Sequence, residues 1–319
     1  MFEEFFSTKK EVVLGRDATV ISGLGRYSIK DTFECGQCFR HELICETEDY
    51  TEYMTVVGDS IITVGQRKLG ELIFYGATDE ELENIIRPYF TLDTDYEKIQ
   101  RDIKARTDSE WLRSAADAAG GIAILKQEPW EALFSFIVSQ NNNIPRIRKI
   151  IRQLSAAYGV NLTLQKGGKK CPLSKIDGTP CEEKCKECGI CYSFPSAKSV
   201  AESPEKMLPS RPGFRYKYLL DAAEKVSSGS INLDMIAAAR SYTHTVECLK
   251  QIKGVGDKVA SCVALFGFAN LEAFPIDVWM KRAIDTYFDG RLDPTPLGRF
   301  AGIAQQYIFH YIRNLESKK

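Results

Sequence analysis

Residues 249–260 read LKQIKGVGDKVA, and this stretch decides the fold class. Its two glycines, one residue apart, indicate a tight hairpin between two helical segments. Small glycines let backbone N–H groups approach a phosphate closely, so the stretch predicts a helix-hairpin-helix that grips a nucleic-acid backbone. Lys258 directly follows the hairpin, where its amine would be a nucleophile held beside the bound strand.

Asp277 follows nineteen positions after Lys258, in the sequence FPIDVW of residues 274–279. A carboxylate brought back to the lysine can manage protons and stabilise positive charge. The two residues predict an enzyme that attacks a sugar carbon of a nucleotide through a lysine Schiff base. Each also has a simpler interpretation. Asp277 would serve as a helix N-cap after Pro275, and Lys258 would bind phosphate in a non-catalytic protein.

The bulk properties describe an ordinary globular chain of 319 residues with 44% hydrophobic and 27% charged residues. This length allows two or three domains. No apolar run approaches the roughly 18 residues that a membrane span needs. The acidic N-terminus lacks the pattern of a signal peptide, so we expect an intracellular location, cytoplasmic beside the nucleoid or nuclear in a eukaryote. The ten cysteines would then be mostly reduced.

The net charge of −1 excludes a simple polycation. Any nucleic acid must therefore meet a local basic face. The candidates form three groups: Arg146, Arg148, Lys149 and Arg152; Arg211, Arg215 and Lys217; Lys250, Lys253 and Lys258. Each group taken alone is typical of a solvated helix face.

The chain changes character near residue 78. Before it, short segments rich in β-branched and aromatic residues alternate with glycines and predict an antiparallel sheet with strands at 12–14, 39–44, 54–57, 61–64 and 72–75. After it, the pattern is helical, with an apolar, buried helix at 130–139 and later helices near 146–157, 215–228, 244–252, 256–267, 277–288 and 297–316. We expect an α+β fold: an N-terminal twisted antiparallel β domain over 1–78, then a large helical body over 79–319 with the helix-hairpin-helix at about 244–267.

With these residues in view, the chain resembles the 8-oxoguanine DNA glycosylase/AP lyases of the helix-hairpin-helix superfamily over almost its whole length. Five segments carry the resemblance, in the expected order: GQCFR at 36–40, LFSFI through NNNIPRI at 133–147, GVGDKVA at 254–260 with Cys262, PIDV at 275–278, and GIAQ at 302–305 with Phe309. The resemblance implies the same fold, a small twisted sheet followed by a helical body.

The resemblance also implies how DNA is held while the damaged base leaves the stack. Asn141 would fill the vacated space, and Phe214 would wedge beside the opposite strand, where the family usually has tyrosine. Arg146 and Arg215 would read the unpaired cytosine. Gly254, Gly256 and Val259 would belong to the hairpin's contact with DNA. The alternatives are a helix C-cap for Asn141 and phosphate contacts for the arginines.

The base pocket implied by the resemblance recognises the extra ring N–H of 8-oxoguanine through the backbone carbonyl of Gly36, because only glycine lets the backbone come that close. Gln305 would hydrogen-bond the pairing edge of the base. Phe309 and Cys262 would sandwich its faces, with Phe266 nearby. An ordinary turn at Gly36 and plain helix core at Cys262 and Phe266 are the alternatives.

In the implied chemistry, Lys258 must be at least partly neutral to attack the anomeric carbon, release the base and form a Schiff base, after which β-elimination nicks the strand. Asp277 would stabilise the developing oxocarbenium ion. We expect a monomer that acts on duplex DNA containing 8-oxoguanine opposite cytosine and needs no cofactor for catalysis. The alternatives are a related glycosylase for another oxidised or alkylated base, and a non-catalytic protein that binds damaged DNA.

Two features depart from the family. Trp279 stands where animal members have a histidine, two residues after the aspartate. The second departure is an insertion at about 165–192 that carries Cys171, Cys181, Cys185, Cys188 and Cys191. Four of these five thiolates would hold a structural zinc; an iron–sulfur cluster or an unliganded loop are the alternatives. Lys169 and Lys170 in the same insertion would touch phosphate.

Overall fold

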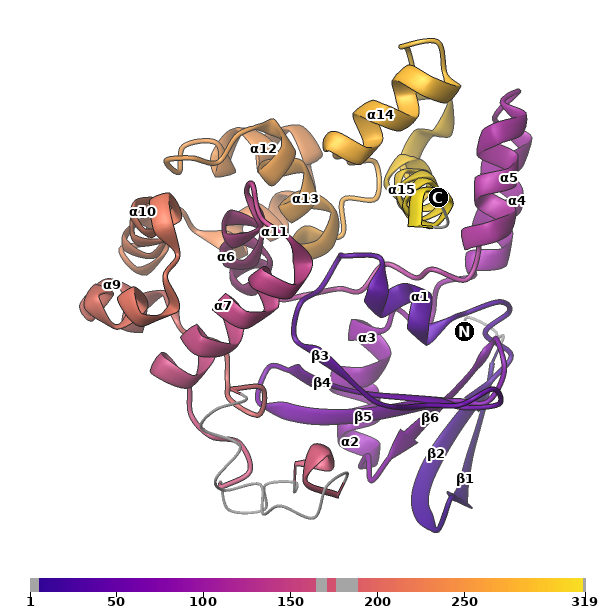
Figure 1. Ribbon diagram of the computed structural model, residues 1–319, viewed down its shortest axis with the longest axis horizontal. Coiled ribbons are helices and arrows are strands. Elements are labelled where there is room, and N and C mark those ends of the chain that lie inside the picture. Colours follow the sequence, from indigo (N-terminus) through magenta and orange to yellow (C-terminus); the bar gives the residue numbers. More distant parts are fainter. Residues whose placement is uncertain (1–5, 165–170, 176–188, 318–319) are drawn as a thin grey trace.

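The computed structural model describes residues 6–164, 171–175 and 189–317. In this part of the chain, six strands form one antiparallel sheet in the order β1-β2-β6-β5-β4-β3 (Figure 1). The strands are β1 (Ser7–Val13), β2 (Arg16–Ser22), β3 (His41–Glu46), β4 (Thr51–Val57), β5 (Ser60–Gln66) and β6 (Glu71–Tyr75). This sheet, followed by helices, confirms the predicted α+β class.

The central strands of the sheet are buried on both faces. Alternation along β4 turns Tyr53 toward the main core, which it shares with the helices, and turns Met54 and Val56 toward a second cluster on the outer face. This outer cluster also holds Cys171 and Cys191, which flank the cysteine-rich insertion. The described ends of the insertion therefore cover part of the outer face of the sheet.

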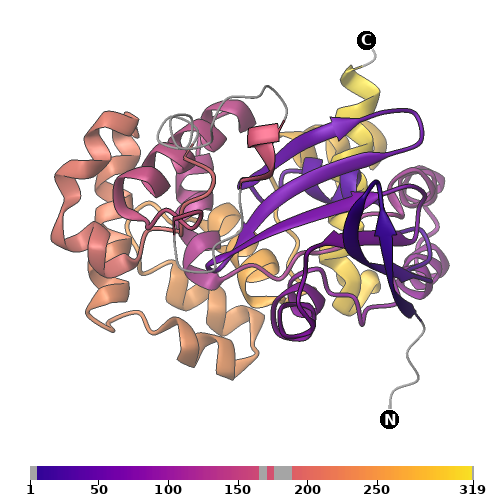
Figure 2. The ribbon, with the colours of Figure 1, turned by 90° about the horizontal axis from the view of Figure 1, so that it is seen from below.

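The helical body follows the sheet and fills the rest of the molecule (Figures 1 and 2). Seen from below, helices α9 to α12 lie beyond one end of the sheet (Figure 2). One short helix, α1 (Ile29–Glu34), lies between β2 and β3. The helical elements that follow the sheet are α2 (Asp79–Glu81), the π-helical turn Leu82–Ile86, α3 (Arg87–Tyr89), α4 (Tyr96–Ala105), α5 (Glu110–Ala119), α6 (Pro129–Ser139), α7 (Ile144–Tyr158), α9 (Ala197–Glu202), α10 (Tyr216–Ser227), α11 (Leu233–Ala239), α12 (Tyr242–Leu249), α13 (Asp257–Phe268), α14 (Val278–Tyr287) and α15 (Ala301–Ser317). Short 3₁₀ turns lie at Pro172–Lys175, Pro204–Ser210, Gly213–Arg215 and Thr295–Phe300.

Helices α6 and α13 form the centre of the body. Seven consecutive residues of α6, 132–138, are buried, as the apolar pattern of this segment predicts. The two helices pack closely, since a methyl group added at Gly267 of α13 would lie 3.0 Å from the Cβ atom of Ala132. A buried, rigid α13 gives the hairpin before it a fixed support.

Two elements of the β region differ from the sequence prediction. The strand expected at 12–14 is half of a hairpin, in which β1 pairs with β2 across a turn at Leu14 and Gly15, both with positive φ. The segment 29–34 is the helix α1, which Ser28 caps by accepting a hydrogen bond from the Asp31 N–H. Among the residues that the structure describes, none belongs to a helix both long and apolar enough for a membrane span.

Candidate active site

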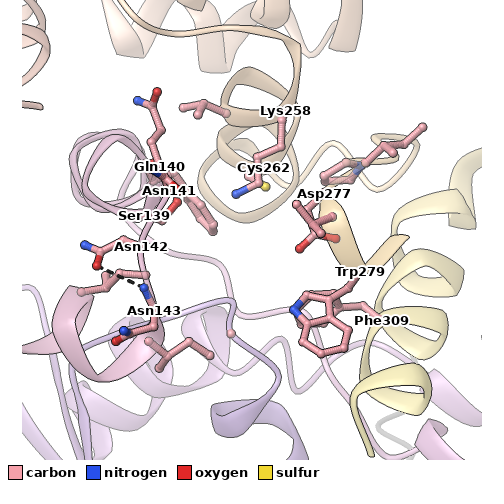
Figure 3. A pocket seen from close by; sticks show the side chains of 18 of the residues that line it. Ser139, Gln140, Asn141, Asn142, Asn143, Lys258, Cys262, Asp277, Trp279 and Phe309 are labelled. Carbon is pink, nitrogen blue, oxygen red and sulfur yellow. Dashed lines mark hydrogen bonds between the residues drawn. The ribbon is translucent and has the colours of Figure 1, made fainter. Parts of the chain in front are cut away.

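A pocket of about 910 Å³ lies between the hairpin and four other parts of the fold. These are the Gly36 turn before β3, the loop between α6 and α7, the start of α14 and the inner side of α15. In Figure 3 the loop with Asn141 stands on one side, Asp277, Trp279 and Phe309 stand on the other, and Lys258 and Cys262 lie between them. The pocket thus collects most of the residues that the sequence singled out.

The hairpin is shaped by two glycines with different surroundings. Gly254 has φ +78, and a Cβ there would lie 2.4 Å from the ring of Tyr218, so only glycine fits. Gly256 precedes the first turn of α13, and a Cβ there would meet nothing within 4 Å. The carboxylate of Asp221 on α10 accepts a hydrogen bond from the Lys253 N–H at 2.8 Å and fixes the turn. The N-terminus of α13 is therefore open, and its geometry and dipole would suit an anion.

Lys258 stands in the first turn of α13 and is half-buried. Its Nζ lies 5.4 Å from the centre of the Phe136 ring, which stacks on Phe266. One turn further along, burial raises the pKa of the Cys262 thiol, while a hydrogen bond and the charge of Lys258 oppose that rise. Within the described residues, no carboxylate comes within ion-pairing distance of Lys258, so its amine faces an open pocket.

Asp277 caps helix α14. Its Oδ1 accepts a hydrogen bond from the Met280 N–H at 2.8 Å, as the N-cap interpretation predicts. The residue is half-buried and lies across from Lys258 and Cys262 (Figure 3). Its negative charge adds to the effect of burial in raising the pKa of Cys262, and both residues line the pocket. The side chain that caps α14 is thus also part of the pocket lining.

The Gly36 turn forms another wall. Gly36 has φ +84, a conformation that favours glycine, and a Cβ there would lie 3.7 Å from the Phe309 ring. The next residue, Gln37, is completely buried and ties the turn to the body. Its side chain donates to the carbonyls of Thr32 and Ala123 at 2.8 Å and accepts from the Leu125 N–H at 2.8 Å. No separate role for Gln37 is predicted from the sequence, because two of its partners, Ala123 and Leu125, lie 86 and 88 residues away.

Helix α15 supplies the facing wall. Gln305 is buried and Phe309, one turn later, is half-buried. The adjacent Gln306 is also buried and donates through Nε2 to the Oε1 of Gln305 at 2.7 Å. Gln306 was not among the residues predicted from the sequence, although the pair of glutamines lies between the apolar residues Ala304 and Tyr307.

The loop between α6 and α7 carries Asn141. This residue is exposed, has φ +47, and follows the last residue of α6 by two positions, the place where a left-handed asparagine often ends a helix. Asn143 begins the next helix by accepting a hydrogen bond from the Arg146 N–H at 3.0 Å. The conformation of the loop therefore leaves the Asn141 side chain facing solvent beside the pocket.

The two arginines expected to read cytosine lie in different settings. Arg146 is exposed on the first turn of α7. Arg215 is 4% exposed and donates to three backbone carbonyls: Gln140 at 2.8 Å, Asn141 at 2.8 Å and Pro212 at 3.2 Å. Burial, with the nearby charge of Arg146, lowers the pKa of Arg215. In this state Arg215 holds the Asn141 loop, and the Arg146 guanidinium is the more accessible of the two.

Phe214 and Val259 were also expected to contact DNA, and they lie in different settings. Phe214 is 48% exposed and its ring lies 6.1 Å from that of Tyr218, so it projects as a wedge would. Val259, in the first turn of α13, is buried and lines the pocket instead of the outer surface. Trp279 also lines the pocket and carries the Arg282 guanidinium 5.0 Å from its ring centre.

The cysteine-rich insertion is described only in part. Cys171 and Cys191 are buried in the outer cluster of the sheet, and neither lines the pocket. Cys181, Cys185 and Cys188 lie outside the described residues, as do Lys169 and Lys170. Among the described residues, no three His, Cys, Asp or Glu side chains are grouped to hold a metal ion. The predicted metal site stays a prediction.

Fold and site together define a class of protein. A twisted antiparallel sheet precedes a helical body, and a helix-hairpin-helix with a following lysine faces an aspartate across a pocket. This combination defines a DNA glycosylase of the helix-hairpin-helix class.

Comparison with known proteins narrows the class. Residues 20–133 match the family described as 8-oxoguanine DNA glycosylase, N-terminal domain. The solved structure of MBOgg1 with a low-affinity DNA ligand is 32% identical, covers 98% of this chain and 99% of that chain, and has a TM-score of 0.80. The Clostridium acetobutylicum 8-oxoguanine glycosylase/lyase, solved with DNA containing cytosine opposite 8-oxoG, is 29% identical with a TM-score of 0.79, over 98% of this chain and 99% of that one.

A curated relative, the N-glycosylase/DNA lyase of Saccharomyces cerevisiae, is 28% identical over 277 residues. That match covers 80% of this chain and 66% of the yeast protein, just under two thirds. The chain belongs to the 8-oxoguanine DNA glycosylase/lyase family.

Proposed function

We propose that this protein is a bifunctional DNA repair enzyme that excises 8-oxoguanine from duplex DNA and then nicks the strand. The observation that carries the proposal is the meeting of Lys258 and Asp277 in one pocket directly behind the hairpin. The hairpin would hold the phosphates, which places the sugar of an extruded nucleotide at the lysine. We expect the protein to act as a monomer on chromosomal DNA.

The chemistry follows from these two side chains. The amine of Lys258 would form a bond to the anomeric carbon as the bond from that carbon to the base breaks, and the departing base would take up the proton that the amine loses. Asp277 would stabilise the positive charge that develops on the sugar ring. Opening of the ring then gives the Schiff base. Loss of a proton from the adjacent sugar carbon expels the 3′ phosphate and nicks the strand.

Recognition of the lesion would use the two facing walls of the pocket. The Gly36 carbonyl would accept the extra ring N–H of 8-oxoguanine, which normal guanine lacks. Gln305 would meet the pairing edge, and Phe309, Cys262 and Phe266 would cover the faces of the base. Support comes from the position of the Gly36 turn, which the hydrogen bonds of Gln37 hold in place. A Cβ added at Gly36 would lie 3.7 Å from the Phe309 ring.

A preference for cytosine opposite the lesion would rest first on Arg146. Its guanidinium is exposed beside the Asn141 loop, and five N–H donors suit the acceptors of an unpaired cytosine. Arg215 would join it once the Asn141 loop rearranges around the DNA. The relative from Clostridium acetobutylicum was solved on DNA with cytosine in this position, which agrees with the proposal.

The proposal is tested by borohydride trapping on a labelled duplex with 8-oxoguanine opposite cytosine, beside an undamaged duplex. We expect a covalent protein–DNA band only with the lesion, and no band from the Lys258→Gln variant, which should still bind. Alkali-labile breaks without a trapped band would instead indicate a glycosylase without lyase chemistry. Binding without either product would favour a damage-binding protein, and activity only on an alkylated base would favour another lesion.

We further propose that the cysteine-rich insertion holds a structural zinc. Five cysteines within 21 residues exceed the four that a tetrahedral site needs. Support comes from Cys171 and Cys191, since the two ends of the insertion are anchored in the same buried cluster. Metal analysis of the purified protein should find about one zinc per chain. Iron and sulfide in its place would indicate a cluster, and a metal-free protein of full stability would overturn the proposal.

A further inference from the structure

Two consecutive glutamines close one end of the pocket. Gln305 and Gln306 are only 3% and 4% exposed, yet both line the cavity. The Nε2 of Gln306 donates to the Oε1 of Gln305 at 2.7 Å. The carbonyl of the Gln305 amide is therefore held by its neighbour.

This contact sets the direction of the other end of the Gln305 amide. Among the described residues its NH2 group forms no hydrogen bond, and it is not one of the sealed polar atoms without a partner. Since Gln305 is otherwise buried and lines the cavity, a molecule in the pocket can contact this NH2 group. Gln305 thus presents a donor to whatever enters.

The stability of the fold does not explain why residue 306 is a glutamine. Its Oε1 is fully buried and has no hydrogen-bond partner in the described part of the chain. A buried carbonyl without a partner destabilises a fold, and a leucine of similar size would avoid that cost. A polar group kept in such a place calls for another reason, and the one hydrogen bond that its side chain forms among the described residues is with Gln305.

We propose that Gln306 is a positioning residue that fixes Gln305 as a hydrogen-bond donor toward the base. It thereby selects a purine with a carbonyl at position 6 over one with an amino group there. Guanine-type bases present the O6 acceptor, whereas adenine-type bases present an N6 donor. A donor fixed against a donor leaves two buried groups unpaired, which is an effective way to reject a base. The inference rests on the proposed function, in which Gln305 meets the base.

The test compares two lesions that share the 8-oxo group. Single-turnover excision rates are measured for 8-oxoguanine and for 8-oxoadenine at one position of one duplex, with the wild-type protein, Gln306→Leu and Gln306→Glu. The ratio of the two rates within one preparation does not depend on its active fraction. We expect Gln306→Leu, which frees the Gln305 amide to turn, to lower the ratio by about 5- to 10-fold. Its melting temperature should equal or exceed that of the wild type.

Gln306→Glu adds a signature that a merely structural role would not produce. A protonated carboxyl donates to Gln305 as the native amide does, whereas an ionised carboxylate only accepts and would turn the Gln305 carbonyl toward the base. The ratio should therefore fall with rising pH in this variant and stay flat in Gln306→Leu.

Ratios unchanged within twofold in both variants, with 8-oxoguanine still excised, would overturn the role of Gln306 alone. A wild-type protein that releases no 8-oxoguanine would instead overturn the proposed function, and this inference with it.

Discussion

At the scale of single residues, Asp277 combines an observed structural role with a proposed chemical one, and substitutions can separate the two. Its Oδ1 caps α14 through the Met280 N–H, and its charge reaches the thiol of Cys262 in the pocket. Asparagine caps a helix about as well as aspartate, whereas alanine does not. The charge can therefore be removed while the cap is kept.

We predict that Asp277→Asn retains the stability of the protein and loses excision activity by about 100-fold or more, because only the charge that stabilises the sugar cation is gone. Asp277→Ala should lose the same activity and, in addition, about 1 kcal/mol of the free energy of unfolding. Single-turnover excision and urea unfolding of both variants measure the two effects. Near-normal activity in Asp277→Asn would mean that Asp277 is only a cap.

Arg146 and Arg215 differ in their contacts in a way that could not be predicted from the sequence. The sequence placed both near the DNA, and by resemblance gave both the same role. The structure buries Arg215 against the carbonyls of Gln140 and Asn141, which lie 75 and 74 positions earlier in the chain. Contacts between a side chain and a distant backbone leave no periodic signal in the sequence. Only the fold distinguishes the arginine that holds the loop from the one that stays exposed.

At the scale of elements, α10 supports the hairpin from the side. The Tyr218 ring fills the space beside Gly254. The carboxylate of Asp221 accepts a hydrogen bond from the Lys253 N–H and forms an ion pair with Lys225 at 2.9 Å. The same segment begins just after Phe214. The hairpin and the exposed Phe214 are therefore both fixed to α10, so a phosphate bound at the hairpin would set where Phe214 meets a duplex.

The two hairpin glycines give a matched pair of variants. Gly254→Ala should lower the free energy of unfolding by about 1–3 kcal/mol, because the methyl group meets the Tyr218 ring at 2.4 Å and φ is positive. Gly256→Ala meets no protein atom within 4 Å and should change stability by less than about 0.5 kcal/mol. It should nonetheless weaken duplex binding, since the added methyl stands where a phosphate would approach.

Urea unfolding and fluorescence anisotropy on the same two proteins separate these effects. Tight binding by a stable Gly256→Ala protein would show that the phosphate does not sit at the N-terminus of α13.

At the scale of the whole molecule, the sequence predicted the parts with strong local signals. The buried helix at 130–139 and the glycine hairpin agree with α6 and with the turn before α13. The boundary at residue 78 stays a prediction. The β1–β2 hairpin and α1 were missed because their signals are weak: a turn with a left-handed leucine at Leu14, and a six-residue helix whose only marker is Ser28. Gln37, which anchors the Gly36 turn, and Gln306, which lines the pocket, were missed because their burial is decided by tertiary packing.

The junction between sheet and helical body carries a buried histidine. His41 begins β3, is 3% exposed and stacks on Phe33 of α1 with ring centres 5.0 Å apart. Arg148 of α7 donates to the His41 carbonyl and to the Glu42 carboxylate. Burial, followed by the positive charges of Arg148 and Arg152, lowers the pKa of His41 from 6.5 to about 3. Protonation of this ring would place an uncompensated charge where the two halves of the fold meet.

The sign of the pH effect follows from this lowered pKa. Below about pH 6.5 the unfolded chain takes up a proton at His41 that the folded protein refuses until about pH 3. Stability is therefore lost as the pH falls through this window, by about 1.4 kcal/mol between pH 7.5 and pH 5.5. In His41→Phe, which keeps a ring on Phe33, the loss over the same interval should be smaller by that amount.

Urea unfolding of both proteins at the two pH values measures the difference. His310, whose pKa burial also lowers, is present in both and cancels. Equal pH dependence in the two proteins would show that His41 becomes protonated within the folded state, which would mean that the junction opens to water before the molecule unfolds.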